Sequence, residues 1–513
     1  MTNSKRWLWW IILVGFALRF GAWFYFGIHP LYLVTTRLPD DALYYFTIAS
    51  NLAHGYGISF DTVHPTNGMH PLWLFLITPI FALGLAKWGF IYAVLLFQSV
   101  LDTIIIWLIG SMIYELLPNT SESNRKTAAT SAALIYALSF LVIIRSINGL
   151  ETTLTALLFV IWFRMFLRTR SGMLKDWAIF GIVTGLLMLS RTDSFIVLLP
   201  LVVYTFVARI KLEWRGMLLA LILAVVILAP WLIWNFVQFG TIVQSSAEAV
   251  PMLAMRKYDV LYGASKYWHF GIEAVRNILK PFWYAAFGLP VLTIGYAIIA
   301  RRKKISQAER GIYSLIVGGV LLLIVHSLFR GFIRDWYIEE LIPIFLIGFG
   351  ISIGANAGST EARPSGRFML AALVILLQLI LFRQPQYQSQ ATILQTGLPT
   401  LEKLTQHTKV ASFNSGYYGY FASTPGSMIN IDGVVNSDAL TALKSGRIGE
   451  YLANDSVSYI LDFQGDFGGY VNLFDHHMMD GFERDSTFGN PNGGNDALAL
   501  YRRKTILGQK QIP

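Results

Sequence analysis

Long apolar runs separated by short polar segments dominate the first three quarters of the chain. Twelve such runs lie at residues 7–28, 72–86, 90–117, 127–144, 151–167, 177–190, 195–208, 216–236, 281–300, 311–328, 336–354 and 368–383. A helix needs about 20 mostly apolar residues to cross the hydrocarbon core of a bilayer, and many of the runs approach that length. The pattern therefore predicts an α-helical polytopic membrane protein.

Basic residues between the apolar runs predict the orientation of the helices, because cytoplasmic loops carry the excess of Lys and Arg. The most basic segments lie at 125–126, 168–175, 209–215, 301–310 and 363–367. All of these segments and the N-terminus can face the cytoplasm only if one of the early apolar runs does not cross the membrane. The run at 72–86 is short and follows Pro71, so we expect eleven spans plus one half-embedded helix.

This topology predicts which parts of the chain lie outside the cytoplasm. They are residues 29–89, 145–151, 191–193, 237–280 and 329–335, and the polar tail after the last span. The tail contains strand-like and helical runs at 409–413, 439–452 and 458–463. We therefore expect a membrane domain at 1–383, with a first external loop at 29–71, and an extracytoplasmic α/β domain at 384–513.

The composition agrees with a membrane protein and excludes several kinds of chemistry. Hydrophobic residues make up 55% of the 513 residues and charged residues only 14%, and the mean hydropathy is +0.52. The chain has no cysteine, which excludes disulfides, thiolate metal sites and cysteine nucleophiles. The net charge of +10 is concentrated in short loops between apolar runs, where it reports orientation and does not indicate nucleic-acid binding.

The first external loop gathers acidic residues at the membrane boundary. Pro39 can begin a helix, Asp40 and Asp41 follow in its first turn, and Gly55 can end it. One face of this helix is apolar and consists of Ala42, Phe46, Ala49 and Leu52. We expect a helix that lies at the membrane interface and holds its carboxylates at the rim of the spans. Acids in a first turn also stabilise a helix terminus, so a purely structural role is the alternative.

The residues after this helix carry a specific resemblance. Residues 49–57 read A-x-N-L-x-x-G-x-G, and residues 67–73 read N-G-x-H-P-L-W at the entry to an apolar helix. With the acid pair, these motifs resemble the integral-membrane glycosyltransferases of the GT-C fold. That superfamily includes protein O-mannosyltransferases, lipid A aminoarabinose transferases, mycobacterial arabinosyltransferases and oligosaccharyltransferases. The resemblance in layout covers about residues 7–383, whereas the motif match is confined to a few loops.

The resemblance implies a polyprenyl-phosphate-linked sugar as donor and an acid of the first loop as catalytic base. Transfer with inversion needs a carboxylate to take the proton of the acceptor hydroxyl, and cations to neutralise the departing phosphate. Asp40 is the expected base, and Asp41 is expected to orient it, to bind the acceptor or to contact a metal. His64, Asn67 and His70 are the candidate acceptor or loop residues, although a loop histidine is more often a simple hydrogen-bonding residue.

Two external turns offer cations for the donor phosphate. Arg191 interrupts two apolar runs, and Arg330, Arg334 and Tyr337 lead into another span. A guanidinium presents several hydrogen-bond donors to phosphate oxygens, so we expect these residues to bind the donor phosphate. Interfacial Arg and Tyr also anchor helices without any catalytic role, and that interpretation stays open.

Two more external residues are candidates because of their position. Glu151 begins a span where many family members carry a second acidic motif, so the resemblance implies a divalent metal bound by Glu151 and Asp41. The chain has a single acid there in place of a D-x-D or D-x-E pair, and Glu151 alternatively compensates Arg145. Lys257 lies in the 237–280 segment, which is expected to cover the site once the lipid binds.

The predicted function is transfer of a sugar from a polyprenyl-phosphate donor to a glycan, lipid or protein acceptor, outside the cytoplasm, at a bacterial-type plasma membrane. A transporter or flippase of lipid-linked sugars is one alternative, but transporters place ionisable residues within their spans. Here Asp102 is the main acid inside a long apolar run, whereas other acids and arginines collect in external loops. A second alternative is an inactive homologue whose tail binds glycan.

Overall fold

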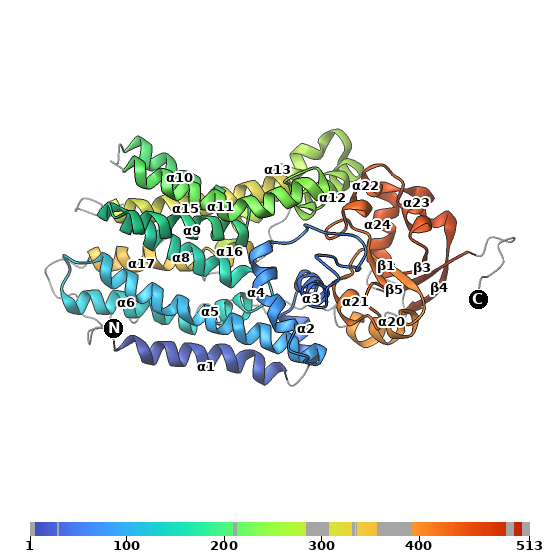
Figure 1. Cartoon of the computed structure of the whole chain (residues 1–513), viewed down its shortest axis with the longest axis horizontal. Coiled ribbons are helices and arrows are strands. Elements are labelled where there is room, and N and C mark those ends of the chain that lie inside the picture. The colour runs from blue at the N-terminus through green and yellow to red at the C-terminus, as the bar shows by residue number, and fades with distance from the viewer. Residues whose placement is uncertain are drawn as a thin grey trace. The chain divides into compact units, whose positions relative to one another are not determined.

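The computed structural model describes residues 6–27, 30–208, 213–283, 307–330, 334, 336–356, 392–488 and 497–504 (Figure 1). The chain divides into two compact units. Unit 1 consists of Met1–Ile28, Tyr92–Leu232 and Tyr267–Gln384. Unit 2 consists of His29–Ile91, Ile233–Lys266 and Pro385–Pro513.

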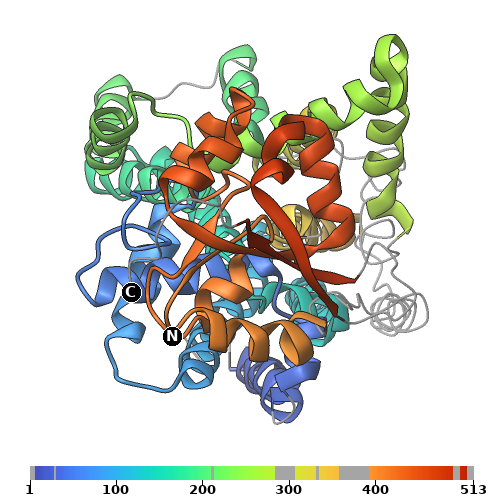
Figure 2. The same ribbon diagram turned by 90° about the vertical axis from the view of Figure 1, so that its right-hand side faces the viewer.

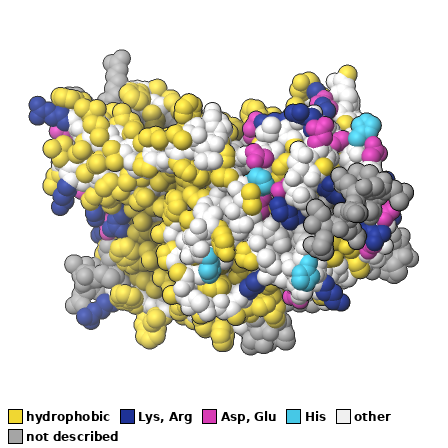
Figure 3. All heavy atoms as spheres, turned by 45° about the vertical axis from the view of Figure 1, so that its right-hand side comes forward, with side chains coloured by type: hydrophobic (Ala, Val, Ile, Leu, Met, Phe, Trp, Pro, Cys, Tyr) yellow, Lys and Arg dark blue, Asp and Glu magenta, His cyan; other side chains and the backbone are white. Residues whose placement is uncertain are grey.

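Unit 1 is helical. It contains all or most of α1 (Leu8–Gly27), α5 (Lys87–Leu116), α6 (Glu122–Leu138), α7 (Phe140–Ser146), α8 (Thr152–Arg168), α9 (Leu174–Ser190), α10 (Ser194–Val207), α11 (Trp214–Phe239), α13 (Lys266–Trp283), α15 (Gln307–Arg330), α16 (Trp336–Glu339) and α17 (Ile342–Asn356). A short 3₁₀ turn at Thr169–Ser171 follows α8, and another at Gly263–Ser265 belongs to unit 2. On the face that Figure 3 shows, hydrophobic side chains cover much of the helical part.

The apolar helices agree with a multi-pass membrane protein. Among the described residues, the helices long and apolar enough to cross a bilayer are Lys87–Leu116, Thr152–Ser171, Trp214–Phe239 and Glu309–Phe329. Helix α4 (Pro71–Phe81) covers the run expected to be half-embedded, and its 11 residues are too few to span the hydrocarbon. The runs at 281–300 and 368–383 fall almost entirely outside the described residues, so the count of eleven spans stays a prediction.

A buried ion pair joins three helices of unit 1. Arg19 of α1 donates from Nε to Asp102 of α5, and both side chains have no exposed surface. Tyr136 of α6 donates its hydroxyl to the same carboxylate at 2.5 Å. The other guanidinium nitrogens donate to carbonyls of Gly15, Tyr136 and Ala137. Asp102 is therefore bound on both oxygens by neighbouring helices, as a charge buried among apolar helices must be.

Unit 2 combines short helices with one sheet. Its helices are α2 (Pro30–Thr36), α3 (Asp40–Ala53), α4, α12 (Ser245–Tyr262), a π turn at Ile393–Gly397, α20 (Leu398–Leu404), α21 (Gly416–Phe421), α22 (Ser437–Lys444), α23 (Ile448–Asn454), α24 (Gln464–Phe474) and a 3₁₀ turn at His476–Gly481. Its strands are β1 (Lys409–Ser412), β2 (Met428–Asn430), β3 (Val457–Phe463), β4 (Phe482–Phe488) and β5 (Leu498–Arg503).

The elements predicted in the tail are confirmed with one difference. Strands β1 and β3 occupy the runs at 409–413 and 458–463. The helical run at 439–452 is two helices, α22 and α23. They are divided at Gly446, whose φ of 66° lies in the left-handed region that ends helices.

The sheet has the strand order β2-β1-β3-β5-β4. Strand β1 is parallel to both of its neighbours, and β5 is antiparallel to β3 and β4. The chain leaves β1 for β2 on one side and later returns to β3 on the other side. Crossovers between parallel strands are almost always right-handed, so two crossovers in opposite directions place helices on opposite faces. Figure 2 shows helices on both sides of the sheet. The carboxyl end of β1 is thus a topological switch point, where α/β sheets usually present their functional groups.

Helix α3 forms where Pro39 and the acid pair predict it, and it ends before Gly55, whose φ is 85°. The expectation of one apolar face on an interfacial helix is wrong. Buried residues occupy all sides of α3, including Leu43, Tyr44 and Ile48 away from the expected face. The physical reason is that α4 and α21 both pack against α3 and enclose it.

Candidate active site

The carboxylate of Asp40 is held by the main chain that follows β1. Its Oδ2 accepts the N–H of Gly416 at 3.0 Å, and its Oδ1 accepts the N–H of Tyr417 at 2.9 Å. The phenol of Tyr417 returns the contact by donating to the carbonyl of Leu38 at 2.8 Å. The first turn of α3 is therefore fastened to the carboxyl end of β1, the switch point of the sheet.

The surroundings of Asp40 change its protonation. Burial raises the pKa of Asp40 to about 6, and the charge of Asp41 adds to the increase. The N–H groups of Tyr417 and Gly416 and the hydroxyl of Tyr44 act in the opposite direction and lower the pKa. A pKa of about 6 suits a general base, because such a group works best when its pKa lies near the working pH.

Two more polar groups of unit 2 belong to this site. The Tyr44 hydroxyl accepts the N–H of Ser415 at 3.2 Å and donates to the carbonyl of Phe413 at 3.4 Å. Asp432 follows β2, and its Oδ1 accepts the N–H of Val434 at 2.8 Å. Burial raises the pKa of Asp432 to about 8, with smaller contributions from the charges of Asp40 and Asp41. A neutral carboxyl group is a hydrogen-bond donor, so Asp432 adds a donor close to the carboxylate pair.

Asp432 was not among the residues predicted for the site from the sequence. The signal was present, since an acid directly after a short apolar strand of an α/β domain lies at the carboxyl edge of the sheet. The three tyrosines at 417, 418 and 420 are nearly inaccessible, with exposed fractions of 0%, 0% and 6%.

The loop after α3 is fastened to the segment before α12. Asn67 donates its amide to the carbonyl of Val243 at 3.2 Å and accepts the N–H of Ser245 at 3.0 Å. The main-chain N–H of His70 donates to the hydroxyl of Tyr45 at 2.9 Å. Asn67 and His70 therefore make hydrogen bonds that hold the shape of the loop, and their role toward an acceptor stays a prediction.

His64 is held between two acids. Its Nδ1 lies 2.8 Å from Asp61 and its Nε2 lies 3.9 Å from Asp438 of α22. The hydrogen bond with Asp61 raises the pKa of His64, against the effect of partial burial. Lys257 is exposed on α12, the helix that forms part of the segment expected to cover the site.

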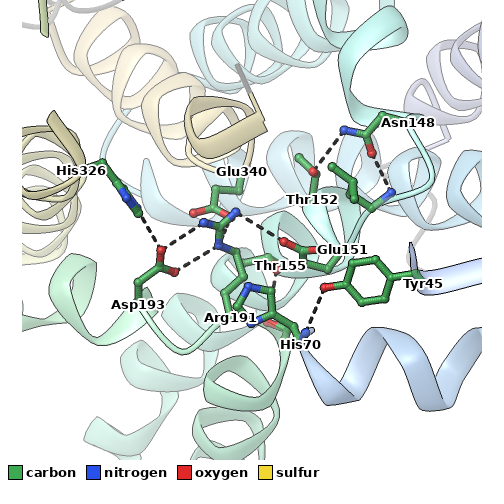
Figure 4. Close-up of polar contacts among 12 residues, drawn as sticks. Tyr45, His70, Asn148, Glu151, Thr152, Thr155, Arg191, Asp193, His326 and Glu340 are labelled. Atoms are coloured by element: carbon green, nitrogen blue, oxygen red, sulfur yellow. Dashed lines mark hydrogen bonds and ion pairs between the residues drawn. The ribbon is translucent and has the colours of Figure 1, made fainter. Parts of the chain in front are cut away.

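In unit 1, Arg191 lies at the centre of a buried group of acids (Figure 4). Its Nε and Nη2 donate to Asp193 at 3.1 and 3.0 Å, Nη1 is 3.5 Å from Glu151, and Nε is 3.3 Å from Glu340. His326 also contacts Asp193, at 2.9 Å. With three carboxylates around a guanidinium that is 1% exposed, the geometry favours a helix-anchoring role for Arg191 over phosphate binding.

Of the other predicted phosphate ligands, Tyr337 belongs to this buried group and Arg334 lies at the surface. The Tyr337 ring lies 4.8 Å from the guanidinium carbon of Arg191 and stacks on His326 with ring centroids 4.5 Å apart. Arg334 is exposed, with its guanidinium 5.6 Å from the Trp336 ring. The side chain of Arg330 lies outside the described residues.

The two predicted metal ligands, Glu151 and Asp41, belong to different units of the chain. Glu151 faces Arg191, and Asp41 belongs to unit 2. Over the part of the chain that the structure describes, no three His, Asp or Glu side chains are grouped so that they could hold a metal ion. Divalent cations need several carboxylate or carbonyl oxygens, so a metal bound by Glu151 and Asp41 stays a prediction.

A comparison with family models gives one match. Residues 64–234 match the family described as dolichyl-phosphate-mannose-protein mannosyltransferase. None of the curated proteins matches the chain.

Solved structures show the fold more completely. ArnT from Cupriavidus metallidurans bound to undecaprenyl phosphate is 12% identical, with a TM-score of 0.57 over 98% of this chain and 99% of that one. The oligosaccharyltransferase AglB from Archaeoglobus fulgidus, in complex with an inhibitory peptide and a dolichol-phosphate, is 12% identical, with a TM-score of 0.55 over 100% of this chain and 75% of AglB. The Archaeoglobus fulgidus oligosaccharyltransferase has also been solved with Zn and sulfate, at 12% identity and a TM-score of 0.55 over 96% of this chain and 73% of that one.

Proposed function

From the GT-C fold that this chain shares with ArnT and AglB, we propose that it is an inverting glycosyltransferase. Its donor is a sugar on polyprenyl phosphate and its acceptor is a glycan, lipid or protein outside the cytoplasm. The observation that carries this proposal is Asp40, a partly buried carboxyl group with a raised pKa, held on two main-chain amides at a sheet switch point.

The grouping of chain segments supports an extracytoplasmic site. Unit 2 unites His29–Ile91, Ile233–Lys266 and Pro385–Pro513. Each of these segments overlaps a part of the chain that the basic loops predict on the outer side of the membrane. We therefore assign the Asp40 site to that side, with the N-terminus in the cytoplasm.

The proposed reaction uses Asp40 as general base. The acceptor hydroxyl attacks the anomeric carbon from the face opposite the phosphate and transfers its proton to the Asp40 carboxylate. The bond between the anomeric carbon and the phosphate oxygen breaks, and polyprenyl phosphate leaves with both electrons of that bond. Asp41 orients the acceptor, the neutral Asp432 donates a hydrogen bond to it, and Arg334 binds the departing phosphate.

Arg334→Gln is expected to raise the KM for the donor about tenfold and to leave the fold intact, because an exposed guanidinium contributes charge-assisted hydrogen bonds to phosphate. Donor titrations with the purified variant provide the measurement. Arg484→Gln, which removes an exposed arginine of β4, is the matched control and should keep the wild-type KM. An unchanged KM in Arg334→Gln would remove Arg334 from the phosphate site.

The rate of transfer should fall as the pH decreases through about 6, because the base must be ionised to accept a proton and its pKa is raised to about 6. Asp41→Asn removes a negative charge that raises this pKa, so the acidic limb of the pH profile should move to lower pH. Initial rates across the pH range test both points. Complete loss of transfer in Asp41→Asn would instead identify Asp41 as the base.

The alternatives make different demands on the molecule. A transporter needs ionisable groups available within its spans, but Asp102 is neutralised by Arg19 and bound by Tyr136. An inactive glycan-binding homologue needs an accessible binding surface on the tail, whereas the tyrosine group at 417–420 is buried. Both observations favour the transferase.

The deciding experiment incubates the purified protein in liposomes with a panel of radiolabelled polyprenyl-phosphate sugars and with glycan, lipid and peptide acceptors. We expect label to move from the lipid-phosphate fraction to one acceptor class. Label that crosses the bilayer while the sugar–phosphate bond stays intact would indicate a flippase. Binding of glycan with no cleavage of any donor would indicate the inactive homologue.

A further inference from the structure

The proposed base and the groups that hold it come from distant parts of the chain. Asp40 and Gly416 are 376 residues apart, yet their contact is a direct hydrogen bond. We propose that the turn between β1 and α21, residues 413–417, positions the Asp40 carboxylate for the reaction, and that Gly416 is the positioning residue that permits this contact. The inference rests on the proposed function, since it assigns a role in the same reaction.

Gly416 is required for space. A Cβ atom at this position would lie 2.3 Å from the main-chain oxygen of Asp40 and 2.8 Å from both its Cγ and its Oδ1, closer than real Cβ contacts allow. The backbone of Gly416 does not lie in the left-handed region, so a side chain is excluded by the main chain and the carboxylate of Asp40 and not by its own conformation. Any larger residue must therefore push Asp40 away and break the bonds from the Gly416 and Tyr417 amides.

The same turn is held by a second residue of α3. Tyr44 lies one helical turn after Asp40, and its hydroxyl bonds to the N–H of Ser415 and the carbonyl of Phe413. Asp40 and Tyr44 together therefore bind four main-chain groups of one turn. This arrangement fixes the direction of the Asp40 side chain.

The turn itself is anchored to the sheet. Asp462 at the end of β3 accepts the N–H of Phe413 at 2.6 Å, and Asn430 at the end of β2 donates to the Ser415 hydroxyl at 2.8 Å. Both anchors are fully buried. The parallel strands on the two sides of β1 thus determine where the turn lies, and through the turn they determine where the base lies.

The amides also keep the base ionised. Burial and the charge of Asp41 both raise the pKa of Asp40, and the two N–H groups are the main opposing influence. Without them the carboxyl group would be protonated over more of the physiological pH range and unable to accept a proton.

The test compares Gly416→Ala with Gly469→Ala, a glycine of α24 whose added Cβ would meet nothing within 4 Å. The full-length variants are assayed in liposomes for the pH dependence of transfer. We expect the control to match the wild type. Gly416→Ala should lower kcat at least tenfold and move the acidic limb upward by roughly one pH unit, because a carboxylate that loses an N–H donor binds its proton more tightly.

Tyr44→Phe provides a second test that adds no atom to the packed turn. It removes only the hydroxyl that holds the turn and lowers the pKa of Asp40, so a smaller upward shift of the acidic limb is expected. If Gly416→Ala does not fold, the result with Tyr44→Phe decides. Unchanged acidic limbs in the folded variants, with transfer intact in the wild type, would refute this inference alone. Absence of transfer in the wild type would refute the proposed function itself.

Discussion

Asp40→Asn should reduce sugar transfer by about 10²–10⁴-fold, the usual contribution of a general base, while the protein still folds and binds its donor. The substitution keeps the size of the side chain and one oxygen that accepts a main-chain N–H. It removes the group that takes the proton of the acceptor hydroxyl. The large effect should therefore appear in kcat, with little change in the KM for the donor.

The matched control is Asp485→Asn, which neutralises an exposed aspartate of β4 and should transfer sugar at the wild-type rate. Melting curves of both purified variants separate loss of catalysis from loss of folding. Transfer by Asp40→Asn within tenfold of the wild type would contradict the assignment. In that case Asp41→Asn would be expected to show the large loss instead.

Arg191→Met should destabilise the protein by about 3–5 kcal/mol, because it leaves buried carboxylates without their cation. Glu151, Asp193 and Glu340 each lie within 3.5 Å of the guanidinium. Methionine fills similar volume but supplies no charge, so the acids must take up protons or water. Denaturant or thermal unfolding in detergent measures the change in the free energy of unfolding.

Two comparisons sharpen this test. Arg215→Met removes an exposed arginine and should change the free energy of unfolding by no more than about 0.5 kcal/mol. Adding Glu340→Gln to Arg191→Met should recover part of the loss, because one uncompensated charge disappears. If Arg191→Met is as stable as the wild type and has a higher KM for the donor, Arg191 binds the donor phosphate and does not anchor the helices.

The family match and the solved structures bear on the fold more than on the residues of the site. A likeness at 12% identity shows how the chain is folded, and the transferase activity stays a proposal for assay. The predicted GT-C resemblance is confirmed by these comparisons. The predicted roles of the site residues have not been tested by them and rest on the variants described above.

The amino-acid sequence by itself determined the local features of this protein. Apolar run length predicted membrane helices, and proline and glycine predicted the bounds of α3, because these properties depend only on residues near one another in the chain. The pattern of basic loops likewise predicted which segments share one side of the membrane. The acid pair at 40 and 41 was visible for the same reason.

Only the tertiary structure decided the partners of these residues. The contact between Asp40 and the amide of Gly416 joins positions 376 residues apart, and Arg191 meets Glu151 across 40 residues. Such contacts depend on how strands and helices pack, which no local pattern contains. Through this packing, Arg191, a predicted phosphate ligand, lies buried among acidic side chains. The packing also places Asp432 and the turn at residues 413–417 beside Asp40.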